Sequence, residues 1–396
     1  MTTPKFIKIM KTNFFLCVSV VLMLAVIFMW LDRENILVKS APLDPEVNEM
    51  ISQARALQKK GELENALITF EKYAMRGHPV AMYHVGRAYA RGWGTKPDLD
   101  KARHFFLLAA SYSFAYRAET AYELGRLYQR AIGPECNKMA IGWFLKSLEW
   151  NHFKAAMQLA VHHEKGLGTP QNMAQAIYYY KIAASHGNEQ ALLKYARVVL
   201  TGRYGVTADP EHAYILVNRA LDSLLHRARN GSAGSAKQLG RLYRDGELLP
   251  LDYEQAKYWL LHAAELGNTG GMHDYARLML TISEQAADHK EALEWLRRAA
   301  TKGHGGAMNS LGKFHLTQKY GLEKAGAVAW FKMGIGVSHG AAIEQMAKLY
   351  LQGELVAKNI EAALKLLEKG VLLGHSGSER LLKRTQKSLT ETPKSS

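Results

Sequence analysis

The chain has 396 residues, of which 48% are hydrophobic and only 10 are proline, so it is apolar enough to fold and suits a mostly helical protein. Two cysteines, Cys17 and Cys136, exclude a disulfide framework. The net charge of +15 favours acidic partners such as anionic lipid or acidic polysaccharide, although a lysine-rich solvated surface would give the same balance.

An uncharged apolar segment follows a basic tail of residues 1–13, which contains Lys5, Lys8 and Lys11. Residues 14–31 carry no charge and no proline, and 18 helical residues span ~27 Å, close to the hydrocarbon thickness of a bilayer. We interpret the segment as a transmembrane helix that acts as a signal anchor, with residues 32–46 as a linker. By the positive-inside rule, the N-terminus is expected in the cytoplasm of a bacterium, and the rest of this single-pass inner-membrane protein in the periplasm. A signal peptide cleaved before Ala41 is the alternative.

Two patterns then alternate along the chain. The first has a glycine, a basic residue directly after it and a tyrosine three positions after it, as around Gly86, Gly125 and Gly240. The second has an alanine, bulky residues three and four positions later and small residues seven and eight positions later. Its first alanines lie 35 to 43 residues apart, at Ala66, Ala102, Ala140, Ala176, Ala213, Ala256, Ala292, Ala327 and Ala363. Both patterns have the period of an amphipathic helix, so the chain is predicted to repeat a helix–loop–helix unit.

Residues at the expected helix ends support this prediction. Glycines suited to a left-handed C-cap end the first helix of several units, at Gly92, Gly166, Gly246 and Gly353. Residues typical of N-caps begin the second helix, at Asp98, Asn172, Asp209, Asp252, Asp288 and Asn359. We therefore assign these carboxylates and amides to capping and not to metal binding or catalysis.

The combined pattern resembles the Sel-one-like repeat, a relative of the tetratricopeptide repeat. The matching residues in one copy are Ala81, Gly86, Tyr89, Gly92, Gly94, Asp98, Ala102, Phe105, Phe106, Ala109 and Ala110, and the resemblance covers residues 47 to 375. It implies an all-α, right-handed superhelical solenoid of about nine helix–loop–helix repeats. We expect repeat block one over 47–221, an insertion and hinge at the glycine–serine run of 222–235, block two over 236–375, and a C-terminal cap and polar tail over 376–396.

The residue after the repeat glycine is basic in seven of eight copies. These residues are Arg87, Arg126, Arg197, Arg241, Arg277, Lys313 and Lys348. On a helical wheel the position lies nearly opposite the leucine and tyrosine of the core, so the heads are expected to face water. The resemblance places that side on the concave face of the solenoid, and we name the seven residues the basic ladder. The alternative is that they pair with nearby acids such as Glu123 or Asp274.

No pattern typical of a catalytic, metal or cofactor site appears. His162-His163-Glu164 lacks the spacing of a metalloprotease helix, and His163 occupies the tyrosine position of its repeat, which favours a packed histidine. We expect no enzymatic activity, no cofactor and no metal. A hydrolase of the cysteine-rich type described for some relatives is disfavoured by the two cysteines.

The resemblance implies a membrane-anchored scaffold or adaptor that binds partner proteins in its groove, in envelope assembly, secretion, polysaccharide export or signalling. The alternative is a receptor that binds an acidic polymer through the basic ladder. The expected partners are thus proteins, or an acidic polysaccharide or acidic protein segment, with the membrane contacted through residues 14–31; nucleic acid is not expected.

Overall fold

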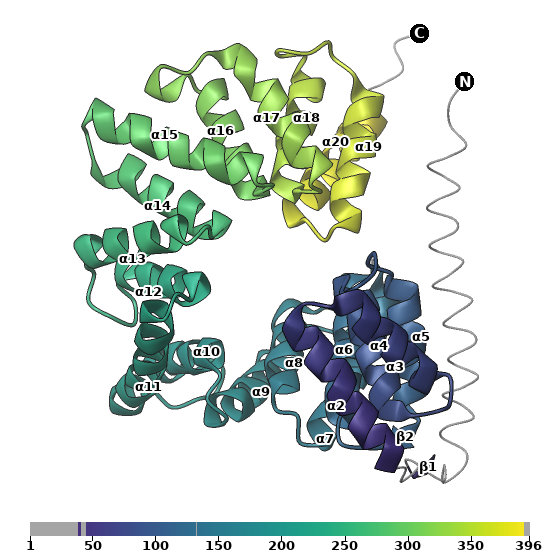
Figure 1. Cartoon of the computed structure of the whole chain (residues 1–396). Helices are drawn as coiled ribbons and strands as arrows, with labels where there is room; N and C mark the ends of the chain where they lie inside the picture. The colour runs from purple at the N-terminus through teal and green to yellow at the C-terminus, as the bar shows by residue number, and fades with distance from the viewer. Residues whose placement is uncertain (1–38, 41–44, 132, 392–396) are drawn as a thin grey trace, which may run out of the picture. The chain divides into compact units, whose positions relative to one another are not determined.

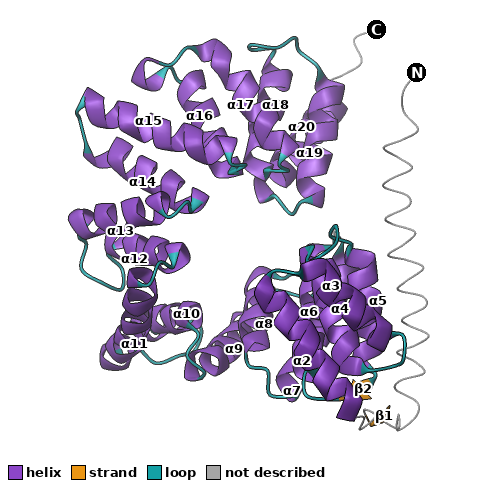
Figure 2. Cartoon of the chain, viewed as in Figure 1, coloured by secondary structure: helices purple, strands orange, loops and turns teal. Residues whose placement is uncertain are grey.

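The computed structural model describes residues 39–40, 45–131 and 133–391 (Figure 1). Helices joined by short loops make up nearly all of this part of the chain (Figure 2). The predicted transmembrane segment and the basic tail before it lie outside the described residues. Among the helices that are described, none is long and apolar enough to cross a membrane.

The described helices alternate between the two types that the sequence predicts. The first helices of the repeats are α4 (Pro79–Arg91), α6 (Arg117–Arg130), α8 (Lys154–Lys165), α10 (Glu189–Thr201), α12 (Ala233–Asp245), α14 (Thr269–Ile282), α16 (Gly305–Leu316) and α18 (Gly340–Gln352). The second helices are α5 (Leu99–Ala110), α7 (Pro134–Glu149), α9 (Met173–Ser185), α11 (Pro210–Arg229), α13 (Tyr253–Glu265), α15 (Ala286–Thr301), α17 (Ala327–Gly336) and α19 (Ile360–Leu372).

A further pair, α2 (Pro45–Lys60) and α3 (Leu63–Ala74), precedes these, and α20 (Ser376–Glu391) follows them. Within the described residues this makes nine helix pairs and one terminal helix, which confirms the predicted all-α repeat array. Two 3-10 turns, η1 (Lys319–Gly321) and η2 (Lys324–Gly326), join α16 to α17, and β1 (Lys39–Ser40) pairs in parallel with β2 (Tyr112–Ser113).

The repeat glycines lie where the two helices of a pair nearly touch. A Cβ built on Gly86 would lie 2.7 Å from the ring of Phe106, and one on Gly125 would lie 2.6 Å from the ring of Phe144. Gly240 stands in the same relation to Leu260, at 2.5 Å. Each contacted side chain is four positions after the repeat alanine, so the two sequence patterns meet in one close helix–helix contact.

Most of the predicted caps are present. Asp98, Asn172, Asp209, Asp252 and Asn359 each accept backbone N–H groups at the start of a second helix, and Gly92, Gly166, Gly246 and Gly353 end first helices in the left-handed conformation. The prediction for Asp288 is wrong. Because α15 begins earlier, at Ala286, Asp288 lies within its first turn, where it accepts a hydrogen bond from the Ser283 hydroxyl.

The chain divides into two compact units near the end of α10. Unit 1 includes the residues up to Tyr195 and Tyr204–Val206, and unit 2 includes Ala196–Arg203 and the residues from Thr207 onward. This division lies before the insertion at 222–235, where we expected the boundary between the two blocks. Each unit is described by itself below.

The insertion lengthens a helix and forms no separate loop. Helix α11 runs for 20 residues to Arg229, and Ala220, Leu224 and Ala228 are buried on one face at helical spacing. The glycine–serine run then makes a short turn at Gly231, after which Ser232 caps α12. The composition of the glycine–serine run indicated a flexible segment, but most of the inserted residues form helical turns of α11 that pack on buried surface.

Candidate partner-binding face

The basic ladder lies on the first helices, one residue after each close helix contact. Arg87 and Arg126 belong to unit 1, on α4 and α6. The other five residues belong to unit 2: Arg197 on α10, Arg241 on α12, Arg277 on α14, Lys313 on α16 and Lys348 on α18. The structure therefore places equivalent cations on successive first helices within each unit.

A second residue shares the ladder's face of each helix. Residues four apart are neighbours on a helix surface, so the side chain four positions before each cation lies beside it. These side chains are Tyr83, Tyr122, Leu193, Lys237, His273, Asn309 and Glu344, in chain order. We call each ladder residue together with its neighbour a rung, and the surface that the rungs form within each unit the rung face. Our sequence reasoning missed this position, although its i, i+4 spacing from the ladder was the available signal.

The rungs of unit 1 combine arginine with aromatic rings. The Arg87 guanidinium lies over the Tyr83 ring at 5.5 Å and over the Trp93 ring at 5.1 Å. Arg126 lies 6.0 Å from the Tyr122 ring and 3.9 Å from a Glu123 carboxylate oxygen. Such contacts hold planar cations against apolar surface, which makes this part of the face both apolar and basic.

The buried His84 and its neighbours pack against the Tyr83 rung. Arg55 donates a hydrogen bond of 2.7 Å to the Tyr116 hydroxyl and lies 3.3 Å from Nε2 of His84. The Tyr116 ring in turn stacks on Tyr83 with a centroid distance of 5.0 Å. Burial, with the charges of Arg55 and Arg87, lowers the pKa of His84 to about 3, so this imidazole stays neutral at physiological pH.

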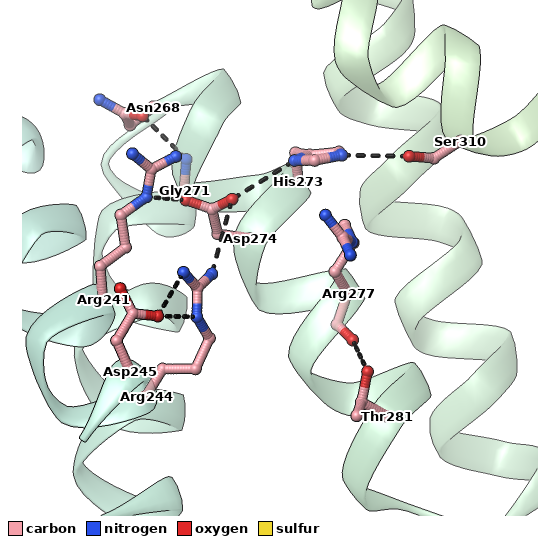
Figure 3. A network of polar contacts seen from close by, with 10 residues as sticks. All are labelled: Arg241, Arg244, Asp245, Asn268, Gly271, His273, Asp274, Arg277, Thr281 and Ser310. Carbon is pink, nitrogen blue, oxygen red and sulfur yellow. Dashed lines mark hydrogen bonds and ion pairs between the residues drawn. The ribbon is translucent and has the colours of Figure 1, made fainter. Parts of the chain in front are cut away.

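In unit 2 a buried carboxylate connects three first helices (Figure 3). Asp274 on α14 accepts a 2.5 Å hydrogen bond from Nε of Arg241 on α12. Its neighbour His273 lies 3.4 Å from the same carboxylate and, through Nε2, 3.1 Å from the Ser310 hydroxyl on α16. The chain of contacts therefore fixes the position of α12, α14 and α16 relative to one another.

These partners keep the Asp274 carboxyl group ionised. Burial alone would raise the pKa of this carboxyl group, but the hydrogen bonds from His273 and Arg241 and the charge of Arg241 outweigh burial and lower the pKa to about 2. Asp274 is 5% exposed, so it depends on those partners for its stability as an anion.

The ladder is not a uniform row of free cations. Arg126, Arg197, Arg241 and Lys348 lie within ion-pair distance of Glu123, Glu247, Asp274 and Glu344, respectively. These four side chains remain 35–47% exposed, so they face water and an acidic neighbour at once, and the pairing with Glu123 and Asp274 that we held as the alternative is found. For Arg277 and Lys313, both exposed, the structure records no ion pair within the described part of the chain.

The histidines of α8 pack as the repeat position predicts. His163 stacks on Tyr179 at 5.5 Å, at the same repeat positions where Tyr89 stacks on Phe105 in the pair α4/α5. His162 is fully buried. Among the residues that the structure describes, no group of three or more His, Cys, Asp or Glu side chains could hold a metal ion.

Comparison with known proteins identifies the repeat. The model of the Sel1 repeat matches residues 79–111, 153–188, 189–223, 234–268, 272–304 and 340–375, which together are more than half of the chain. The chain belongs to the Sel1 repeat family. Pairs α6/α7 and α16/α17 lie between the matched segments, yet Gly125 meets Phe144 and Gly312 meets Phe331 in the same close contact as in the matched repeats.

Two curated relatives are fungal. A chitin synthase regulator of Saccharomyces cerevisiae is 24% identical over 246 residues, which are 50% of this chain and 34% of that protein. Chitin synthase regulatory factor 3 of Schizosaccharomyces pombe is 25% identical over 227 residues, 54% of this chain and 23% of that protein. The chain thus spans about a third or less of the length of these relatives.

Two solved structures of bacterial proteins have similar folds. A Sel1 repeat protein from Oxalobacter formigenes is 25% identical, with 63% of this chain and 96% of that chain covered and a TM-score of 0.48. A protective antigen of uropathogenic Escherichia coli with an SLR fold is 24% identical, with 83% and 76% covered and a TM-score of 0.40.

Proposed function

We propose that this Sel1-repeat protein is a scaffold without enzymatic activity that binds partner proteins through the rung face. The family membership and the two regulators among the relatives support an adaptor role. Because these relatives regulate chitin synthases, we favour polysaccharide export among the four processes considered, ahead of envelope assembly, secretion and signalling.

The observation that carries this proposal is the contrast between core and rung face. The core positions repeat: Ala102, Ala140 and Ala256, for example, are all fully buried. The rung neighbours change from two tyrosines and a leucine in unit 1 to lysine, histidine, asparagine and glutamate in unit 2. Packing needs the same small and large residues in every repeat, whereas a face that recognises a partner needs different chemistry along its length.

A photo-crosslinking experiment in intact membranes tests the proposal. A photoreactive amino acid is placed at rung positions Tyr122 or Arg126, or, as matched controls in the same unit, at Tyr178 or Leu108 on second helices, which are 57% and 40% exposed. We expect discrete protein adducts from the rung positions. Adducts from the second-helix positions alone would show that partners use another face.

For its location, we propose that residues 14–31 hold the protein in a bacterial inner membrane with the repeats in the periplasm. Support comes from the uncharged segment and from the lysines before it. An alkaline phosphatase fused after residue 46 should then be active. An inactive phosphatase together with an active cytoplasmic reporter at the same point would reverse the orientation.

A receptor for an acidic polymer is the second candidate, and the basic ladder is the observation that favours it. Four of the seven cations already have acidic neighbours, which leaves fewer charges for a polymer than the sequence alone indicates. Polymer binding would fall steeply with salt, whereas binding of a protein through aromatic rungs would depend on salt weakly.

A further inference from the structure

Two adjacent rungs of unit 2 have cations without an ion pair among the described residues, whereas the other three ladder cations of that unit are paired. Arg277 on α14 and Lys313 on α16 are exposed, and for neither does the structure record an ion pair with a described residue. In Figure 3 only the backbone carbonyl of Arg277 is engaged, by the Thr281 hydroxyl at 2.8 Å. A guanidinium and an ammonium are thus available on neighbouring first helices.

The contact between His273 and Ser310 places these two cations side by side. It joins α14 and α16 at a distance of 3.1 Å. Arg277 lies four residues after His273, and Lys313 lies three residues after Ser310, so each cation is about one helical turn beyond the contact and on the same side of its helix. Packed helices lie ~8–10 Å apart, which sets the order of magnitude of the spacing between the two charges.

Asn309 adds an unused hydrogen-bonding group beside Lys313. It is the neighbour of Lys313 in its rung, it is 9% exposed, and its carbonyl oxygen Oδ1 is buried without a hydrogen-bond partner among the described residues. Buried polar atoms are normally satisfied, so this oxygen has an unused capacity to accept a hydrogen bond. A carboxamide can accept an N–H and donate to a C=O at the same time, which matches a peptide group.

We propose that these two rungs bind an extended acidic segment of a partner protein. In this arrangement Arg277 and Lys313 pair with two carboxylates of the segment, and the Asn309 side chain turns outward from its buried position to pair with a backbone peptide group. Side chains two apart on an extended chain project on the same side about 7 Å apart, close enough for two long, flexible basic side chains to reach both carboxylates. The proposal rests on the scaffold function above and specifies the chemistry of one partner.

The flanking rungs limit the length of the acidic segment. On one side Arg241 is already paired with Asp274, and on the other Lys348 lies 2.6 Å from Glu344. A further carboxylate would gain little from either ion pair, and Lys237, the neighbour of Arg241, is the one further cation in these two rungs. The site is therefore built for a segment with two acidic residues separated by one residue, and not for a long polyanion.

Binding of a defined probe to the full chain in detergent tests the proposal. The probe is a fluorescein-labelled octapeptide of alternating alanine and glutamate, with the alanine–glutamine octapeptide and a labelled oligogalacturonate as comparisons. The variants are Arg277→Gln with Lys313→Gln, and separately Asn309→Ala. The matched control is Arg297→Gln with Lys332→Gln, which removes the same charge from exposed positions of α15 and α17. Fluorescence anisotropy gives Kd, and circular dichroism verifies that each variant is folded.

We expect the rung double variant to weaken binding of the glutamate peptide about tenfold or more, and the control double variant to leave it nearly unchanged. Asn309→Ala should weaken the glutamate peptide several-fold. Equal losses in both double variants, or no binding of the glutamate peptide to the parent, would overturn the proposal. Tighter binding of the oligogalacturonate, unaffected by Asn309→Ala, would replace the peptide by an acidic polysaccharide. Proteins captured by crosslinking at Tyr122 or Arg126 in unit 1 would leave the scaffold function intact in each of these cases.

Discussion

Asp274 in unit 2 shows how neighbouring side chains determine the role of a ladder residue. It is a nearly buried carboxylate held by Arg241 and His273. Two ladder residues that occupy equivalent repeat positions, Arg241 and Arg277, therefore have different roles: one neutralises a buried charge, and the other carries an unpaired charge at the surface. A repeat position alone does not reveal that difference.

The first prediction compares these two arginines. Arg241→Leu should destabilise the protein by about 1–3 kcal/mol at neutral pH, because it leaves the Asp274 carboxylate buried with one partner fewer. Arg277→Leu should change stability by less than about 0.5 kcal/mol. Urea denaturation followed by circular dichroism measures both, and equal effects would contradict the role assigned to Asp274.

The pH dependence of that carboxylate provides the second prediction. The pKa of Asp274 in the folded protein, about 2, lies below its ordinary value of 3.8. Its stabilising contribution is therefore complete above pH 3.8 and is lost as the pH falls toward 2, a change of roughly 2 kcal/mol. Asp274→Asn should be less stable than the parent at pH 6 and should lose less stability between pH 5 and pH 2.5. A parallel loss in both proteins would exclude Asp274 as the titrating group.

The third prediction concerns the close contact at Gly240. A Cβ there would lie 2.5 Å from Cγ of Leu260, whereas a Cβ on Gly234, also helical, would meet nothing within 4 Å. Gly240→Ala should cost about 1–3 kcal/mol through overpacking. Gly234→Ala should be neutral or stabilise by up to about 1 kcal/mol, because alanine favours helix. If thermal melts showed both changes to be equally mild, the helices of this pair would not touch at Gly240.

At the scale of elements, the ends of the helices carry a second kind of repeat. Histidine caps the start of α16, of α18 and of the terminal helix α20. Nδ1 of His304, His339 and His375 accepts the backbone N–H of Ala307, Ala342 and Ser378, respectively. A protonated imidazole cannot accept that bond, and its charge would face the positive end of the helix dipole.

The fourth prediction follows from these caps. Burial is the main cause that lowers the pKa of both His339 and His304 below 6.5. The charge of His375 lowers the pKa of His339 further, and the charge of His273 does the same for His304. Because the folded pKa is the lower one, this stabilisation is complete above pH 6.5 and is lost as the pH falls below it. His339→Asn keeps an N-cap that does not titrate, so it should reduce the loss of stability between pH 7.5 and pH 5.5 by up to about 1 kcal/mol. Urea titrations at the two pH values measure this, and an unchanged loss would show that His339 does not contribute.

At the scale of the whole molecule, the division into two units determines where the chain is most open to cleavage. The segment between α10 and α11 contains exposed Arg203 and Tyr204, and Gly202, Tyr204 and Gly205 have positive φ. It also lies where the two compact units divide.

The fifth prediction is therefore that trypsin cuts first after Arg203, which lies outside any helix and is accessible. Arg227 and Arg229 should resist longer, because they belong to the last turns of α11. Sequencing of the early fragments should find an N-terminus at Tyr204. A first cut after Arg229 would contradict this prediction and would show that the glycine–serine run is the more accessible segment.

The sequence by itself determined the repeat architecture, because a packing contact that recurs in every pair demands the same residues at the same spacing. The meeting of Gly86 with Phe106 and of Gly240 with Leu260, and the caps at Asp98 and Asn172, follow from such local rules. The wrong prediction for Asp288 has the same origin, since α15 begins earlier than the repeat pattern indicates.

Only the tertiary structure decided which ladder cations are paired, because ion pairs such as Arg241 with Asp274 join helices 33 residues apart. It also decided that the insertion after α11's repeat alanine is helical, since Leu224 and Ala228 find buried surface to pack against, and composition cannot show that surface. The chemistry of the rung face likewise depends on neighbours from other repeats. Packing within one repeat depends on residues that are close in the sequence, so it can be predicted from the sequence. The electrostatics of a face depend on residues from different repeats that only the fold brings together.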